Sequence, residues 1–209
     1  MTYPQPPWLL RGYAIQTLQL VEIDRIRPHI PSELEIISVF PGKTIGGIYL
    51  AAYGDGSTLT YNELIVVGAM VHKGTNFGGW ISHIYVDHPD SIAGGRQIWG
   101  LPKEQADFTW NHQGPLSVTV QQGNQTLCRL ESRWQIPGWS QPLTVPVIST
   151  KASHLACFNG QANFKVHLAN AALFIPPESP FAPLKLDKPM LSFYCNPLEL
   201  VANPPSLIS

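Results

Sequence analysis

Proline and glycine divide this chain into short apolar runs. The 209 residues include 20 Pro and 17 Gly, which bound the apolar runs and do not gather in one segment. Proline interrupts helices and central strands, and glycine favours turns. The pattern therefore favours many short strands over long helices. Segments rich in β-branched and aromatic residues, which we expect to be strands, are 13–22, 34–40, 45–53, 63–71, 80–86, 116–122, 126–135, 164–175 and 191–201.

Two segments have helical features. Asp24 is expected to cap a short turn that runs to Ile30, and Asp90 is expected to cap a helix over 91–99 that ends at Gly100. About ten strands with two short helices indicate an all-β-dominated fold, either a barrel or a sandwich with small α additions. A chain of this length is expected to form one domain over residues 1–209.

The charge content is low for a globular protein. Charged residues make up 13% of the chain, about half the usual quarter, and 13 Lys and Arg against 14 Asp and Glu leave a net charge of −1. This balance predicts no nucleic-acid partner and no membrane partner, because both would need a basic surface. A chain with few charges to cover its surface is also expected to form a homo-oligomer that hides part of it.

The chain shows no signal for secretion or disulfide bonding. Its N-terminus has no basic segment and carries early prolines, and its longest apolar stretch, Leu64–Val71, is far shorter than the roughly 20 residues that a bilayer span needs. Cys128, Cys157 and Cys195 are odd in number and far apart. A disulfide framework and a structural zinc site are therefore not expected. We predict a cytoplasmic protein.

Common catalytic motifs are absent from the sequence. It contains no glycine-rich nucleotide-binding motif, no Gly-x-Ser-x-Gly and no His-Glu-x-x-His. The seven histidines are scattered and lack the companion ligands of a metal site. We therefore predict no cofactor and no metal.

One lysine has an unusual sequence environment. Lys103 follows the predicted end of a helix and is flanked by Trp99, Leu101 and Phe108. An amine held in an apolar pocket loses affinity for its proton and becomes a nucleophile. The alternative is an ordinary solvated lysine, the commoner situation for this residue type.

Three segments resemble the acetoacetate decarboxylase family. The segment from Tyr85 to Lys103, YVDHPDSIAGGRQIWGLPK, resembles the family's Tyr-x-Asp … Gly-Arg-Glu-x-x-Gly/Ala-x-Pro-Lys block without a gap. Tyr61-Asn-Glu63 resembles its Tyr-x-Glu, and residues 31–36, PSELEI, resemble its Pro-x-x-Leu-x-Ile. The resemblance runs in order over roughly residues 10–110.

The resemblance implies a closed or cone-like antiparallel barrel with an internal cavity, usually in an oligomer. It implies that Lys103 forms a Schiff base with the substrate and that Glu63 helps to transfer protons. Arg11 lies near an active-site arginine of the family, and Arg96 matches an arginine of the conserved block, where it either binds substrate or braces the helix. Further side chains that we expect in the substrate-binding cavity are His83, Tyr85 and Trp99.

The sequence departs from the family pattern at three places. Glu104 replaces a second lysine after the nucleophile, Gln97 replaces a glutamate, and no acidic residue is present at 48–49. An anion at position 104 would favour the charged form of Lys103, although neighbouring residues of an extended chain point to opposite faces.

Two functional hypotheses follow. The first is a lyase that forms a Schiff base with a keto acid, for decarboxylation of a β-keto acid or for related aldolase or dehydratase chemistry. The second is a non-catalytic β-barrel that binds an apolar small molecule, with a protonated Lys103 paired with an acid such as Glu63.

Overall fold

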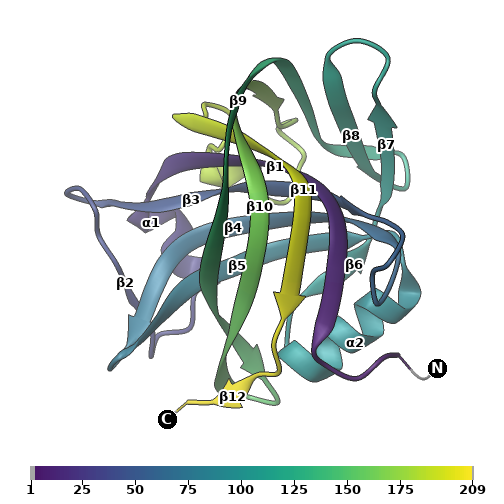
Figure 1. The fold of residues 1–209 in the computed structure, drawn as a ribbon. Coiled ribbons are helices and arrows are strands. Elements are labelled where there is room, and N and C mark those ends of the chain that lie inside the picture. Colours follow the sequence, from purple (N-terminus) through teal and green to yellow (C-terminus); the bar gives the residue numbers. More distant parts are fainter. Residues whose placement is uncertain (1–2, 209) are drawn as a thin grey trace.

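The computed structural model describes residues 3–208, and strands dominate it (Figure 1). The strands are β1 (Trp8–Glu22), β2 (Glu35–Ile36), β3 (Lys43–Tyr53), β4 (Tyr61–Lys73), β5 (Asn76–Val86), β6 (Lys103–Gln105), β7 (Asp107–Asn111), β8 (Leu116–Gln122), β9 (Gln125–Lys151), β10 (His154–Phe174), β11 (Leu191–Ala202) and β12 (Ser206–Leu207). The helices are α1 (Ile23–Ile26) and α2 (Pro89–Trp99), with single 3₁₀ turns η1 (Arg27–His29) and η2 (Ala182–Leu184).

The sheet closes on itself. Its strand order β10-β11-β1-β3-β4-β5-β9 returns to β10, because β9 pairs with both β5 and β10. The contact between β5 and β9 is short and parallel, and it joins Gly79 to Val147 and Trp80 to Ile148. In Figure 1, β9, β10, β11 and β1 cross in front of β3, β4 and β5. The strand-dominated closed sheet with two short helices that the sequence predicts is confirmed.

The ring has an inner and an outer face, and both bury apolar side chains. Side chains directly opposite one another on antiparallel strands share a face, and neighbours along a strand alternate. On β4, Leu64 belongs to an outer cluster that also contains Phe181 from the segment around η2. Tyr61 belongs to an inner cluster with Leu10 and Val86. Side chains from β1, β4 and β5 therefore meet inside the ring.

Both α-helices are present near the predicted positions, but each begins two residues earlier than the sequence predicts, so the caps differ. The N-cap of α2 is His88, whose ring accepts the backbone N–H of Asp90 at 3.1 Å, so Asp90 lies inside the first turn. Gly100 ends this helix with a left-handed φ of 67°, as expected for a glycine after a helix. The N-cap of α1 is Glu22 and makes no capping bond with its side chain, and Asp24 again lies within the first turn.

Several predicted strands have different lengths in the structure. The strand expected over 164–175 begins at His154, and the one expected over 13–22 begins at Trp8. The expected strand over 34–40 is reduced to β2, with two residues. In contrast, β9 continues past the predicted end at 135 to Lys151, despite prolines at 137, 142 and 146. Between residues 133 and 146, β9 pairs with β10 on one side, and its other edge has no strand partner in the described structure. Proline is tolerated on a strand with a free edge, because the N–H that it lacks has no partner there.

Helices in the described part of the chain are short. The longest is α2, with eleven residues. No helix within residues 3–208 has the length and apolar composition needed to cross a membrane.

Candidate active site

Strand β6 carries Lys103 to the inside of the ring. The turn at Gly100 reverses the chain after α2, and β6 then pairs in parallel with β5, with Lys103 opposite Ile84. The Arg96 Nε–H donates a 2.8 Å hydrogen bond to the backbone carbonyl of Lys103. The lysine stem passes over Gly95, where a Cβ atom would lie only 2.5 Å from Lys103 Cδ. The glycine is therefore required by the close approach of the lysine.

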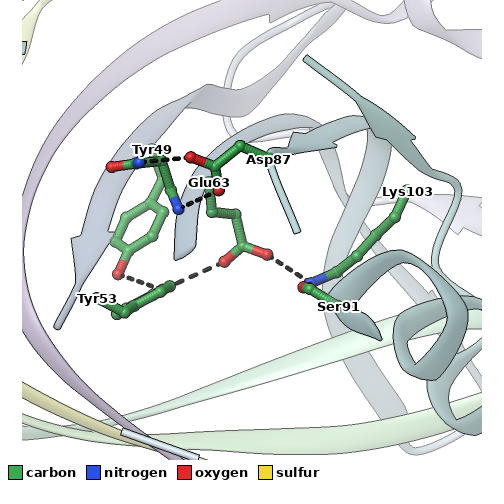
Figure 2. A network of polar contacts seen from close by, with 7 residues as sticks. Tyr49, Tyr53, Glu63, Asp87, Ser91 and Lys103 are labelled. Atoms are coloured by element: carbon green, nitrogen blue, oxygen red, sulfur yellow. Dashed lines mark hydrogen bonds and ion pairs between the residues drawn. The ribbon is translucent and has the colours of Figure 1, made fainter. Parts of the chain in front are cut away.

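The amine of Lys103 meets a carboxylate and a hydroxyl (Figure 2). Its Nζ lies 2.7 Å from Glu63 Oε1 and 2.9 Å from Ser91 Oγ. The side chains of Lys103 and Glu63 are only 4% and 5% exposed. Aromatic rings complete the surroundings, with the Tyr61 ring centre 5.0 Å and the Trp8 ring centre 6.0 Å from Nζ. The amine thus lies in a largely apolar shell with one buried acid beside it.

Two phenols extend the polar network beyond Glu63. The Tyr53 hydroxyl donates to Glu63 Oε2 at 3.2 Å, and the Tyr49 hydroxyl lies 3.0 Å from that of Tyr53 (Figure 2). Burial raises the pKa of the Tyr53 and Tyr61 phenols well above the usual range and raises that of Tyr49 as well. These phenols therefore keep their protons near neutral pH, and Tyr53 acts as a hydrogen-bond donor to Glu63.

The backbone next to Glu63 is held by the residue that follows β5. Asp87 accepts the Asn62 backbone N–H at 2.7 Å and the Asn62 side-chain amide at 2.6 Å. The Trp110 indole N–H donates to the Asn62 side chain at 2.9 Å. This network lies on the opposite face of β4 from Glu63, because neighbouring residues of a strand alternate. It fixes the start of β4 and with it the position of the Glu63 carboxylate.

The site contains the two groups that imine chemistry requires. A neutral amine attacks a carbonyl, and a carboxyl group within hydrogen-bond distance can accept and return protons. A buried lysine and glutamate at 2.7 Å can exchange a proton directly, and little water reaches them. Within residues 3–208, no group of three or more His, Cys, Asp or Glu side chains is arranged to hold a metal ion.

Arg11 does not lie at this site. Its Nε donates to Glu199 at 2.8 Å, and both side chains are about half exposed. The reason is the alternation of β1, which directs Leu10 inward and Arg11 outward. The expectation of a catalytic Arg11, drawn from the family resemblance, is therefore not supported by its position.

Two candidate pocket residues lie on the outer face of β5. Tyr85 is opposite Leu64 and packs toward Phe181 in the outer cluster. The His83 ring also lies near Phe181 and near His29, and burial together with His29 lowers the pKa of His83 to about 4. β5 therefore directs both side chains away from Lys103, and their positions do not support the expectation that they line the substrate site.

Trp99 and Arg96 lie near Lys103 but act through other groups. The Trp99 ring packs edge-on against Trp8, with centroids 4.8 Å apart, and its indole N–H donates to the Asn203 carbonyl. Trp99 therefore supports the ring that faces the amine. Arg96 holds the backbone of Lys103 and so joins the last turn of α2 to β6.

The departures from the family pattern have clear positions. Glu104 is exposed, accepts a hydrogen bond from Gln122 at 2.9 Å, and follows Lys103 in β6, so it points to the opposite face. Gln97 is exposed and accepts from the Tyr3 hydroxyl. At positions 48–49, the partly buried Tyr49 joins the network of Glu63 through the Tyr53 hydroxyl.

Sequence reasoning missed several members of the site, namely Trp8, Tyr49, Tyr53 and Ser91. Tyr49 and Tyr53 are spaced by an even number of residues on one predicted strand, so they share a face. That spacing was the available signal. Which strand face looked toward Lys103 depended on pairings between distant segments.

A surface pocket lies near the end of α2. It has a volume of about 540 Å³, and its lining includes His29, Trp80, Leu101 and Pro102. Lys103 is not part of that lining. The pocket is therefore separate from the amine–carboxylate pair described above.

Fold and site together define a closed strand ring with an amine–carboxylate centre inside it. A sequence model described as acetoacetate decarboxylase matches residues 2–171. The chain belongs to the acetoacetate decarboxylase family, as the resemblance in its sequence predicts.

Individual proteins of known sequence are also similar to part of the chain. NEOXANTHIN-DEFICIENT 1 of Solanum lycopersicum is 33% identical over 107 residues, which are 51% of this chain and 36% of that protein. The chain spans about a third to a half of the length of the NEOXANTHIN-DEFICIENT 1 proteins that it matches, with coverage of 36%, 38% and 54%.

Solved structures share the fold. The acetoacetate decarboxylase of Legionella pneumophila has a TM-score of 0.81 at 17% identity, and the match covers 100% of this chain and 90% of that one. The enduracididine biosynthesis enzyme MppR, solved in complex with pyruvate, has a TM-score of 0.76 at 14% identity, with coverage of 99% and 91%.

Gly95→Ala is expected to displace the amine without unfolding α2. Alanine favours a helix by about 1 kcal/mol over glycine, whereas its Cβ would lie 2.5 Å from Lys103 Cδ and 2.7 Å from Cε. A shift of about 1 Å in a reacting group can cost on the order of 100-fold in rate. We therefore expect the decarboxylation proposed below to slow by at least tenfold, with the helix content measured by circular dichroism retained. The control is Gly54→Ala, whose Cβ meets open space. Equal activity of the two variants would contradict the prediction.

Proposed function

We propose that this protein is a lyase that forms a Schiff base between Lys103 and a keto acid, and that it decarboxylates a β-keto acid. The observation that carries the proposal is the buried contact of 2.7 Å between Lys103 Nζ and Glu63 Oε1. Family membership and the likeness to acetoacetate decarboxylase and to MppR support the same chemistry.

The reaction begins with proton transfer from Lys103 to Glu63. The neutral amine adds to the ketone carbon and gives a carbinolamine. Glu63 then returns its proton to the hydroxyl group of the carbinolamine, which leaves as water. The protonated imine then accepts the electron pair of the breaking bond between the α-carbon and the carboxylate, and carbon dioxide leaves. The enamine takes up a proton on carbon, and water hydrolyses the new imine to release the ketone and restore Lys103.

The apolar surroundings assist the loss of carbon dioxide. They favour conversion of the charged carboxylate of the substrate into neutral carbon dioxide. Tyr53 donates a hydrogen bond to Glu63 and so holds the carboxyl group in position beside the amine. Ser91 provides a second hydrogen-bond partner for Nζ.

The second candidate is a non-catalytic protein that binds an apolar molecule. The observation that favours it is that Lys103 and Glu63 satisfy each other as a buried ion pair. A pair with a purely structural role would have the same arrangement. Carbon dioxide release from a panel of β-keto acids, measured with the unmodified protein, separates the two. We expect saturable release above the spontaneous rate. Saturable binding of the same compounds without release would overturn the lyase proposal.

A further inference from the structure

The inner face of the ring continues past the site along β9. Val147 packs in one cluster with Trp99 and with Trp8, whose ring centre lies 6.0 Å from the Lys103 amine. Because side chains alternate along a strand, Val145 and Leu143 share the face of Val147, and no register shift occurs in this part of the β9–β10 ladder. The three side chains form a row that leads away from the amine.

Neighbouring strands extend this apolar face. Leu143 is opposite Ala162 on β10, which packs against the inner cluster that contains Tyr53 and Tyr61. Further along, Leu168 is opposite Phe193 on β11. In Figure 1, β9, β10 and β11 lie side by side in one layer. The inner face of this layer is therefore lined by aliphatic and aromatic side chains beyond the site.

Exposure differs between the strands of this face. Trp8 and Leu10 on β1 are 2% and 3% exposed, whereas Val145 and Leu143, at the same level of the sheet on β9, are 41% and 44% exposed. Leu168 and Leu191, further along β10 and β11, are similarly exposed. Solvent thus reaches the inner face along β9 and further along β10 and β11, and the side chains that it meets there are apolar. We name Leu143, Val145, Leu168 and Leu191 the apolar rim.

We propose that the substrate is a β-keto acid with an extended apolar chain, which lies along the inner face from Lys103 to the apolar rim. This inference rests on the proposed function and names its substrate class. From Val147 to Leu143 the strand advances about 13 Å at roughly 3.3 Å per residue. This path is longer than the methyl group of acetoacetate can use. Burial of an alkyl chain there would also cover apolar surface that is otherwise exposed to water.

The test is a chain-length series with the full-length protein. Carbon dioxide release is measured for acetoacetate, 3-oxohexanoate and 3-oxodecanoate at concentrations below micelle formation. We expect kcat/KM to rise by about two- to fourfold for each methylene that enters the inner face. Release from acetoacetate with no gain for longer chains would overturn the inference and leave the proposed function standing. Absence of release from every compound would instead contradict the proposed function.

A pair of variants locates the chain. Val145→Asp places a charge on the inner face, whereas Thr144→Asp places the same charge on the opposite, exposed face of β9. We expect the ratio of kcat/KM for 3-oxodecanoate over acetoacetate to fall toward one in V145D and to stay at the wild-type value in T144D. The oligomer mass of both variants is measured by light scattering. An unchanged ratio in V145D would overturn the proposal. If the oligomer mass of V145D also changed, the apolar rim would be assigned to a contact with a second copy of the chain.

Discussion

Replacing Lys103 by methionine should abolish turnover. Methionine retains an unbranched stem that fits over Gly95 but has no amine, so no imine can form. Loss of a covalent nucleophile typically reduces turnover by a thousandfold or more. We therefore expect carbon dioxide release to fall to the spontaneous rate. Residual saturable release in this variant would show that the reaction proceeds without the amine.

The same substitution is expected to destabilise the fold. It leaves Glu63 buried without its cation, and removing one partner of a buried ion pair costs about 3–5 kcal/mol. Urea unfolding measures this change in the free energy of unfolding. The control is the double variant with Glu63→Gln, which removes the unpaired charge and should recover most of the loss. A double variant as unstable as Lys103→Met would show that lost packing, and not the unpaired carboxylate, is responsible.

Glu63→Gln should have the second-largest effect on activity. The amide keeps the shape and can still accept a hydrogen bond from Tyr53, but it cannot accept the proton of the amine. General acid–base groups contribute roughly 10²- to 10⁴-fold, so we expect kcat to fall within that range. Steady-state kinetics with the best β-keto acid of the panel provide the measurement.

Glu104→Gln is the matched control for this variant. It removes a carboxylate from the residue next to Lys103, but that side chain is exposed and bonded to Gln122 on the opposite face of β6. We expect its kcat to remain within about twofold of the wild-type value, the range of most surface substitutions. Equal losses in the two variants would mean that the net charge near Lys103 matters and that Glu63 has no specific part in proton transfer.

Much of the fold could be predicted from local patterns. The strand over Leu116–Gln122 and the helix end at Gly100 follow from residues close in the sequence, and the structure contains both. The continuation of β9 to Lys151 was missed because its prolines indicate a break. They are accommodated because β9 has a free edge, a property of the pairing that no local pattern reveals.

The centre of the site was also predicted, but its surroundings were not. Lys103 and Glu63 were found through their motifs, and the structure brings them into contact. Tyr85 was misplaced because a shift of one residue along a strand reverses the face of the sheet. The direction of each face depends on pairings such as Leu64 with Tyr85, which join segments far apart in the sequence.

Borohydride reduction tests the central claim most directly. The protein is mixed with a β-keto acid, treated with sodium borohydride, digested and mapped by peptide mass spectrometry. The account predicts a reduced adduct on the peptide that contains Lys103, which requires the keto acid and is absent from Lys103→Met. A protein that releases carbon dioxide but carries no adduct at Lys103, or carries it at another lysine, would contradict it.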